Sequence, residues 1–510
     1  MSTANPLTQP DWPECLPELD DLQAGALKHI DNLSRRLPGD WSGMLGESSL
    51  GEDFSALRFQ IAYMAYALAL AHVNRMPAAP VLFRAPMDRL ITKLLSVDCW
   101  IYWSYVSTGN GFFNKSLGEL PQQWDPVAKD NIMYSAYVQS AALMYHYLFR
   151  DAKYAEPAAL TFEVKSMFWG GNGERFEYDE RLLNDIIYWQ MAEMGCLGVA
   201  CEPNYIFQVC NQPNILGFRM HDLIYGGNLA GEATAGYVQA WQNFGMVTDD
   251  GHFQTMVQVH ERTPRTPPDS PGMDFWLGTL LHSWYPEFVE RHYPSQIERS
   301  VQDGPEGTLW IKPIAGPGKP GGATLPALDL SWAAACATEV GDIDRATRLL
   351  AYADHFLNSA WEDGGYYYKR RDENFDTDGH FIGMEPGSGN AIFHLGRLNV
   401  PNGFKMLYDG PWGDEHFAQP AVVRLSGGAD LRRASFHTER QALVLTFATA
   451  ESSQKIRFEI ENATSLGMPQ LVRDGEALAE NSRYGAAHFD EDRLVLTLDQ
   501  KSRTTLVLQW

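Results

Sequence analysis

The residues of this chain best suited to chemistry lie between Cys201 and Asn211. The segment reads Cys-Glu-Pro-Asn-Tyr-Ile-Phe-Gln-Val-Cys-Asn, so two thiols lie close to a carboxylate, an amide and two aromatic rings. The spacing of the cysteines fits neither a zinc knuckle nor a thioredoxin-type redox pair. With Cys201 in a loop before Pro203 and Cys210 in a following helix, both sulfurs are predicted to face one cavity.

A helix that starts after Pro203 would lower the pKa of a nearby thiol, because its first N–H groups are free. Thiols in such a place can serve as acids, and thiolates as bases or nucleophiles. The polar neighbours Glu202, Asn204 and Asn211 support this interpretation. The alternative is that both cysteines are small buried hydrophobic residues, which is the usual role of a free cysteine.

Two carboxylates and a set of aromatic rings are further candidates. Asp274 follows a loop rich in Pro and Gly where a helix is predicted to begin, and Asp40 lies in the turn Pro-Gly-Asp-Trp-Ser. Either is a candidate proton donor, or only a carboxylate that favours a helix N-terminus. Aromatic residues could line an inner wall that binds apolar ligands or stabilises cations, with ordinary core packing as the alternative. The rings concerned include those of Tyr63, Trp103, Tyr137, Tyr205 and Phe207.

The elements that must position these residues are mostly helices. From about residue 20 to 410, apolar residues recur at intervals of three and four in about a dozen short segments, which favours a barrel of paired helices over a long bundle. After Trp412 the pattern changes to alternating, β-branched runs. We predict an N-terminal extension (1–20), a helical-barrel catalytic domain (21–412) and a small antiparallel β-sandwich domain (413–510).

Composition and motifs exclude several functions. A net charge of −24 argues against binding nucleic acid or an anionic membrane surface. The longest apolar run, near residues 61–72, is too short to span a bilayer, and the N-terminus lacks the pattern of a signal peptide. Six scattered cysteines favour reduced thiols in a cytoplasmic protein. Dinucleotide, phosphate-loop, serine-hydrolase and zinc-protease motifs are missing from the sequence, and no metal site is predicted.

The segment from Cys201 to Asn211 resembles the corresponding segment of the linalool dehydratase/isomerase family. Three more stretches match that family in the same order, namely 61–66, 129–134 and 288–294. The resemblance implies that residues 21–412 form an (α,α)6 barrel, so the expected fold is mainly α, with this barrel followed by the β-sandwich. It also implies that no cofactor is needed and that the chain forms a homo-oligomeric ring. The implied reaction is dehydration and isomerisation of an allylic alcohol in an apolar pocket.

Individual residues carry the resemblance to different extents. The two family cysteines correspond to Cys201 and Cys210, and a pocket methionine corresponds to Met133. One turn later this chain has Tyr137 where the family has a pocket histidine. Because the thiols are retained while a polar neighbour differs, we expect related chemistry on a different substrate.

Two further positions depart from the family pattern. A pocket tyrosine of the family is replaced by Gly272, with Asp274 two residues on. Asp40 and Trp41 match an aspartate–aromatic pair near the family's N-terminus, whereas the tyrosine that follows that pair has no clear equivalent here.

The sequence therefore predicts a cofactor-independent lyase, isomerase or cyclase that acts on a small apolar isoprenoid alcohol or alkene. The rivals are a carbohydrate-active hydrolase or epimerase with paired carboxylates and a non-catalytic scaffold. The predicted catalytic residues are Cys201, Cys210, Asp274, Asp40 and Tyr137. The predicted substrate-binding residues are Met133, Tyr63, Trp103, Glu202, Tyr205 and Phe207.

Overall fold

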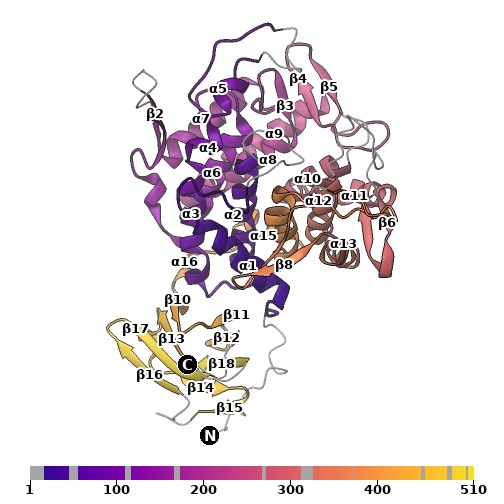
Figure 1. Cartoon of the computed structure of the whole chain (residues 1–510). Helices are drawn as coiled ribbons and strands as arrows, with labels where there is room; N and C mark the ends of the chain where they lie inside the picture. The colour runs from indigo at the N-terminus through magenta and orange to yellow at the C-terminus, as the bar shows by residue number, and fades with distance from the viewer. Residues whose placement is uncertain are drawn as a thin grey trace. The chain divides into compact units, whose positions relative to one another are not determined.

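A computed structural model describes residues 16–44, 56–109, 117–165, 173–266, 271–311, 326–371, 373–448, 454–478, 485–500 and 503–510. Residues 1–15 of the predicted N-terminal extension lie outside this range, as does most of the Pro- and Gly-rich loop before Asp274. The chain forms two compact units (Figure 1). One comprises 1–25, 68–85 and 411–510, and the other comprises 26–67 and 86–410.

Helices make up most of the second unit. The α-helices of the chain are α1 (Asp21–Ser34), α2 (Leu57–Asn74), α3 (Arg84–Leu94), α4 (Val97–Trp100), α5 (Trp103–Val106), α6 (Ile132–Phe149), α7 (Glu180–Glu193), α8 (Gln212–Tyr225), α9 (Leu229–Gln242), α10 (Pro271–Leu281), α11 (Pro286–Ser300), α12 (Pro326–Val340), α13 (Ile343–Phe356), α14 (Phe393–Leu398), α15 (Gly403–Asp409) and α16 (Asp414–Phe417). A π-helical turn, Ser388–Ile392, leads into α14. Short antiparallel sheets join some of these helices: β1 (Leu160–Val164) with β2 (Glu174–Tyr178), β3 (Tyr205–Phe207) with β4 (Met256–Gln258) and β5 (Thr263–Arg265), β6 (Val301–Asp303) with β7 (Leu309–Ile311), and β8 (Ser359–Glu362) with β9 (Gly365–Tyr368).

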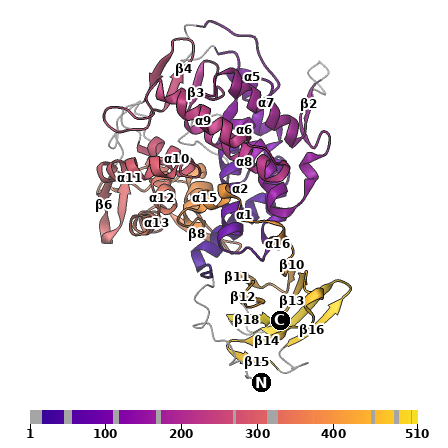
Figure 2. The same ribbon diagram turned by 180° about the vertical axis from the view of Figure 1, so that it is seen from behind.

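Buried and half-exposed helices alternate along this unit. Helix α6 is buried on nearly every side, and α10 is buried along almost its whole length, as expected of helices that are apolar all round. Helices α7, α9, α11 and α13 each bury one face only. The inner helices pack in succession, α6 on α8, α8 on α10, α10 on α12 and α12 on α14 (Figures 1 and 2).

The inner helices run parallel and in register. Tyr63, Tyr137, Trp276 and Trp332 each lie about one and a half turns after the start of α2, α6, α10 and α12 respectively. Contacts between rings join Tyr63 to each of the other three, so these positions share one layer. The N-terminal ends of the four helices therefore meet on the same side of this layer.

Local backbone signals set the limits of several helices. Helix α6 begins at Ile132, directly after Asn131 in a left-handed conformation (φ 61°). The continuous apolar stretch after Phe275 is divided between α10 and α11, because Pro286 opens α11 at a position where its missing N–H costs no hydrogen bond.

The C-terminal unit contains two antiparallel sheets. One has the strand order β10 (Ala421–Ser426), β13 (Gln454–Glu461), β17 (Arg493–Gln500), β16 (Gly485–Asp490). The other has the order β11 (Asp430–His437), β12 (Ala442–Ala448), β18 (Thr504–Gln509), β14 (Gln470–Arg473), β15 (Glu476–Ala477). Alternate residues are buried, such as Ile456, Phe458 and Ile460 of β13, and Phe458 contacts Phe447 of the other sheet.

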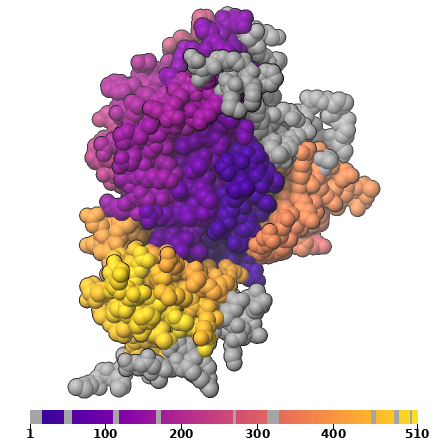
Figure 3. Space-filling view, turned by 60° about the vertical axis from the view of Figure 1, so that its left-hand side comes forward, coloured from indigo at the N-terminus to yellow at the C-terminus, as the bar shows by residue number. Residues whose placement is uncertain are grey.

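The prediction of a mainly helical chain with an antiparallel β region at its C-terminal end is confirmed. Strands β11, β14, β15 and β16 were missed, because polar residues interrupt the apolar alternation of β11, because β14 and β15 are short, and because β16 contains a glycine and two alanines in place of β-branched residues. None of the helices in the described part of the chain is long and apolar enough to cross a membrane. On the face that Figure 3 displays, side chains close the gaps between the indigo and purple helices.

Close contact between α12 and α14 gives a stability test. A Cβ at Gly396 would lie 3.1 Å from the Cα and N atoms of Ala335, which are backbone atoms that cannot move away. We expect Gly396→Ala to lower the free energy of unfolding by about 1–3 kcal/mol, measured by urea denaturation. Without this contact the substitution would stabilise the helix by up to about 1 kcal/mol. An unchanged or raised stability would contradict the close packing.

Candidate active site

Asn211 brings the two thiol-bearing segments together. Its side-chain oxygen accepts a hydrogen bond from Val199 N (2.7 Å), and its side-chain nitrogen donates to the carbonyl oxygens of Val199 and Phe207 (3.0 Å each). A Cβ at Gly198 would lie 2.7 Å from the Asn211 amide, so a glycine is needed there. The loop that ends in Cys201 is thereby fastened to the turn that carries Cys210.

A tight hairpin completes this arrangement. Cys201 N donates to Tyr205 O (2.9 Å), with Asn204 in a left-handed conformation (φ 77°) between them. Residues after Pro203 form strand β3 and then a short 3-10 turn, Val209–Asn211, and not the predicted helix. Helix α8 begins only at Gln212, so Cys210 lies two residues before its first residue, in the preceding turn.

The two sulfurs face each other in a buried environment. Both thiols are free, and they share a hydrogen bond. That bond and burial hold the pKa of Cys201 well above its ordinary value. Burial also raises the pKa of Cys210, although the bond from Cys201 partly offsets this. The prediction of lowered thiol pKa values is therefore wrong, because loss of solvation outweighs the helix terminus.

A hydrogen-bonded aromatic cluster lies beside the thiols. The Tyr137 hydroxyl donates to Tyr63 Oη (2.9 Å) and contacts Met133 Sδ (3.1 Å), while Trp276 Nε1 also donates to Tyr63 Oη. Burial raises the pKa of Tyr63 and of Tyr137 well above the ordinary value, and the nearby Cys210 adds to both shifts. The structure thus groups predicted residues from three elements around neutral hydroxyl and thiol groups.

Two tryptophans extend this cluster towards α12. The rings of Trp276 and Trp332 are stacked, with centroids 5.2 Å apart, and the Trp332 ring meets Tyr63 edge-on at 4.8 Å. Phe59 packs against both Tyr137 and Trp276 at 5.9 Å. The aromatic cluster, defined as Phe59, Tyr63, Tyr137, Trp276 and Trp332, therefore joins four elements of the inner wall.

Arg58 is a buried cation that the sequence analysis missed. Its guanidinium lies over the rings of Tyr102 (4.0 Å) and Phe59 (4.4 Å), and its charge lowers the pKa of both Cys201 and Cys210. The available signal was a single basic residue in the long apolar run of α2. A cation beside two thiols favours their ionised forms and partly counteracts burial.

Other predicted residues lie in different surroundings. Asp40 is half-buried in a turn where its carboxylate accepts from the backbone and hydroxyl of Ser42 (3.0 and 2.6 Å), and these bonds lower its pKa. Trp103 is buried in α5 and contacts no ring of the aromatic cluster among the described residues. Neither residue is placed beside the thiol pair by any contact in the described chain.

The remaining predicted residues belong to the thiol segment itself. Glu202 lies next to the pair, with its Oε1 3.6 Å from Cys201 Sγ. Tyr205 and Phe207 lie on β3, where Tyr205 Oη accepts from Gln258 Nε2 (2.6 Å) of β4. Both aromatic residues therefore support the hairpin that positions Cys201.

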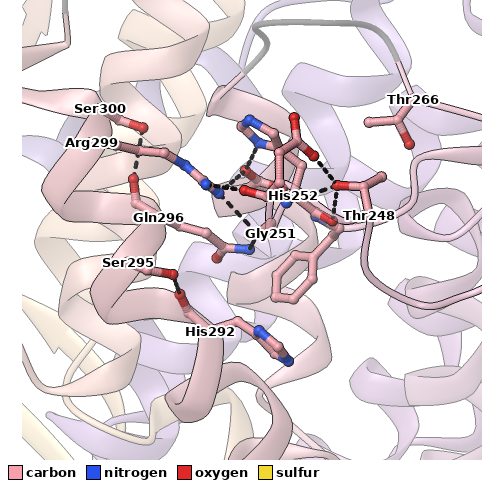
Figure 4. A network of polar contacts seen from close by, with 12 residues as sticks. Thr248, Gly251, His252, Thr266, His292, Ser295, Gln296, Arg299 and Ser300 are labelled. Carbon is pink, nitrogen blue, oxygen red and sulfur yellow. Dashed lines mark hydrogen bonds and ion pairs between the residues drawn. The ribbon is translucent and has the colours of Figure 1, made fainter.

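Asp274 serves as an anchor for a neighbouring loop. One carboxylate oxygen contacts His252 Nδ1 (2.6 Å) and the other accepts from Phe253 N (2.7 Å). This pairing raises the pKa of His252. Arg299 of α11 fastens the same loop by donating to Gly251 O (2.9 Å), as Figure 4 shows. The loop continues to Thr255, whose carbonyl accepts from Gln208 N (3.0 Å) in the thiol segment.

Asp329 is a second buried carboxyl that the sequence analysis missed. It lies in the first turn of α12, is 3% exposed, and accepts a hydrogen bond from Gly272 N (2.9 Å). Burial raises its pKa to about 7, although the Gly272 bond opposes the shift. Within the described ranges, no three His, Cys, Asp or Glu side chains form a metal site.

Comparison with known proteins identifies the family. The linalool dehydratase/isomerase family model matches residues 58–374, which is more than half of the chain. Among solved structures, an unsaturated glucuronyl hydrolase from Bacillus sp. GL1 is 12% identical with a TM-score of 0.43, covering 74% of this chain and 96% of that one. The endoglucanase CelQ from Clostridium thermocellum is 10% identical with a TM-score of 0.38, covering 96% and 92%. Similarity at this level says nothing about the chemistry of the chain.

The raised pKa of Asp329 predicts a pH-dependent stability. Between its unfolded pKa of 3.8 and its folded pKa of about 7, the folded state holds a proton that the unfolded chain has released. Stability conferred by Asp329 therefore falls as the pH rises through this window. Relative to Asp329→Asn, we expect the wild type to lose about 4 kcal/mol of unfolding free energy from about pH 4 to pH 8. The prediction would be contradicted if the unfolding free energies of the two proteins changed with pH in the same way.

Proposed function

Because the chain belongs to the linalool dehydratase/isomerase family, we propose that it is a cofactor-independent lyase or isomerase. Its substrate is a small isoprenoid-like alcohol or alkene, transformed by acid–base chemistry. The observation that carries this proposal is the pair of hydrogen-bonded buried thiols beside the aromatic cluster. Thiols can exchange protons, and aromatic faces stabilise the cation that forms when an allylic hydroxyl leaves.

In this mechanism the two thiols have unequal roles. The hydrogen bond that the thiols share raises the pKa of Cys201 and lowers that of Cys210, so the Cys210 thiolate is the one that the pair stabilises. Cys210 gives its proton to the substrate hydroxyl, and the C–O bond breaks with its electron pair remaining on the oxygen that leaves as water. The Arg58 charge favours the resulting thiolate.

The aromatic cluster stabilises the allylic cation. Each suitably oriented ring face contributes about 0.5–2 kcal/mol in a desolvated site. Tyr137 occupies the position of the family's pocket histidine, and its high pKa keeps it a neutral hydrogen-bonding group at the pH where the enzyme works. The change from an imidazole to a phenol supports a substrate that differs from linalool.

We also propose that the inner helices close into the predicted (α,α)6 barrel. The succession of contacts from α6 to α14 and the packing of Tyr63 in α2 against α6, α10 and α12 support this arrangement. The predicted domain limits, the homo-oligomeric ring and the cytoplasmic location stay predictions.

Hydrolysis of a sugar by paired carboxylates is not favoured by any contact in the site. That alternative relied on Asp274 and Asp40 as an acid–base pair. Asp274 uses both carboxylate oxygens to hold His252 and Phe253, and Asp40 is engaged by Ser42 in an outer turn. Neither carboxylate is therefore placed to attack a glycosidic bond.

Cysteine substitutions test the thiol mechanism. We expect Cys210→Ala to lower kcat for an isoprenoid alcohol at least about 100-fold, and Cys201→Ala to lower it less, because the first removes the proton donor and the second only its support. Turnover is measured by gas chromatography over a panel of isoprenoid alcohols. Cys336→Ala removes an equally buried free thiol from α12 and serves as the control with unchanged kcat. Unchanged turnover in both test variants would rule out the mechanism.

A further inference from the structure

The proposed reaction includes a second proton transfer. After the hydroxyl has left, the carbon next to the cation must lose a proton to form the new double bond. The Cys210 thiolate can take a proton on the side from which the hydroxyl left, whereas the tyrosines of the aromatic cluster are neutral groups whose high pKa values reflect their burial. Loss of a proton from the opposite side of the substrate needs a base on another part of the wall, and a carboxylate would meet this need.

Asp329 lies one helical turn from the aromatic cluster. It precedes Trp332 by three residues on α12, and its hydrogen-bond partner Gly272 precedes Trp276 by four residues on α10. Residues with these spacings share one face of a helix. Since Trp276 and Trp332 are stacked on each other, the Asp329–Gly272 contact lies directly next to that stack, towards the helix N-termini.

Because Gly272 has no side chain, the Asp329 carboxyl can approach the backbone of α10 at this residue. A Cβ at Gly272 would lie 2.2 Å from Asp329 Oδ1, so any other residue would displace it. The carboxyl of Asp329 therefore occupies the space that a side chain at position 272 would take.

Asp329 is bound less completely than the other buried carboxylates of the helical unit. Glu339 contacts His282, Asn399 and Phe404 N, and Glu180 contacts His146 and Tyr225. Asp222 caps α9 through two backbone N–H groups, and Asp274 is held by His252 and Phe253. Within the described part of the chain, Asp329 has a single hydrogen bond and no ion pair.

We infer that Asp329 is the general base of this site and takes the proton from the carbon next to the allylic cation. This inference rests on the proposed function. The C–H electron pair becomes the new double bond, Asp329 becomes neutral, and Cys210 remains a thiolate. Asp329 then releases its proton and Cys210 takes one up, which restores the starting state. This exchange is downhill, because Asp329 has a pKa of about 7 whereas the pKa of Cys210 is raised above its ordinary value.

Two half-reactions separate the roles of Cys210 and Asp329. Ionisation of the alcohol and recapture of water exchange its oxygen with isotopically labelled water, and this needs only the acid. Formation of the alkene also needs the base. We expect Asp329→Asn, which retains an acceptor for Gly272 N, to lower alkene formation at least about 100-fold while oxygen exchange continues. Cys210→Ala is expected to lower both rates.

The control is Asp222→Asn, which changes another buried carboxylate, at the C-terminal end of inner helix α8. Its alkene formation should match that of the wild type. If the wild type is active and Asp329→Asn forms alkene at the same rate, the inference is wrong while the proposed function stands. If the wild type acts on no alcohol in the panel, both are wrong.

The pH dependence of the wild-type reaction tests the inference without relying on a folded variant. Because the base must be ionised, alkene formation should rise with pH through a pKa of about 7, the value to which burial raises Asp329. Oxygen exchange should lack this rising limb. A rate of alkene formation that instead falls through the same pH range would show that the carboxyl acts in its protonated form, and would overturn the inference.

Discussion

The Tyr63 hydroxyl is the contact on which the inner wall depends. It accepts hydrogen bonds from Tyr137 of α6 and Trp276 of α10, and its ring meets Trp332 of α12 edge-on. Three inner helices, α6, α10 and α12, thus contact one residue of α2. Because these groups are fully buried, a hydroxyl displaced from this position would leave two donors without partners, at about 1–3 kcal/mol each. This cost fixes the register of α2, α6 and α10 relative to one another.

This register determines where chemistry can occur. Helices that run parallel place their N-terminal turns on one side of the aromatic cluster, and those turns carry Arg58, Met133 and Asp329. Cys210 joins them because it lies in the turn before α8, and Asn211 brings Cys201 back to it. The candidate site is therefore assembled from chain segments far apart in sequence by a common alignment of helix ends.

Burial has opposite consequences for the two acidic residues of this wall. Asp274 and Asp329 are equally buried and each lies in the first turn of an inner helix. Asp274 is paired with His252 and held by a backbone N–H, so it fastens a loop. Asp329 has only the Gly272 N–H, so burial is poorly compensated and its pKa rises towards neutrality. The partners, and not the residue type, distinguish an anchoring carboxylate from a carboxyl whose pKa is raised by burial.

The sequence by itself determined the helical class, the change to strands after Trp412, and the importance of the segment from Cys201 to Asn211, because periodicity and local clustering are properties of neighbouring residues. It did not determine the end of a helix before Pro286, the strand after Pro203 or the raised thiol pKa values. Those depend on partners distant in sequence. Asp329 was not among the predicted residues, because its removal from water against Gly272 is decided by the surrounding fold and leaves no local signal in the sequence.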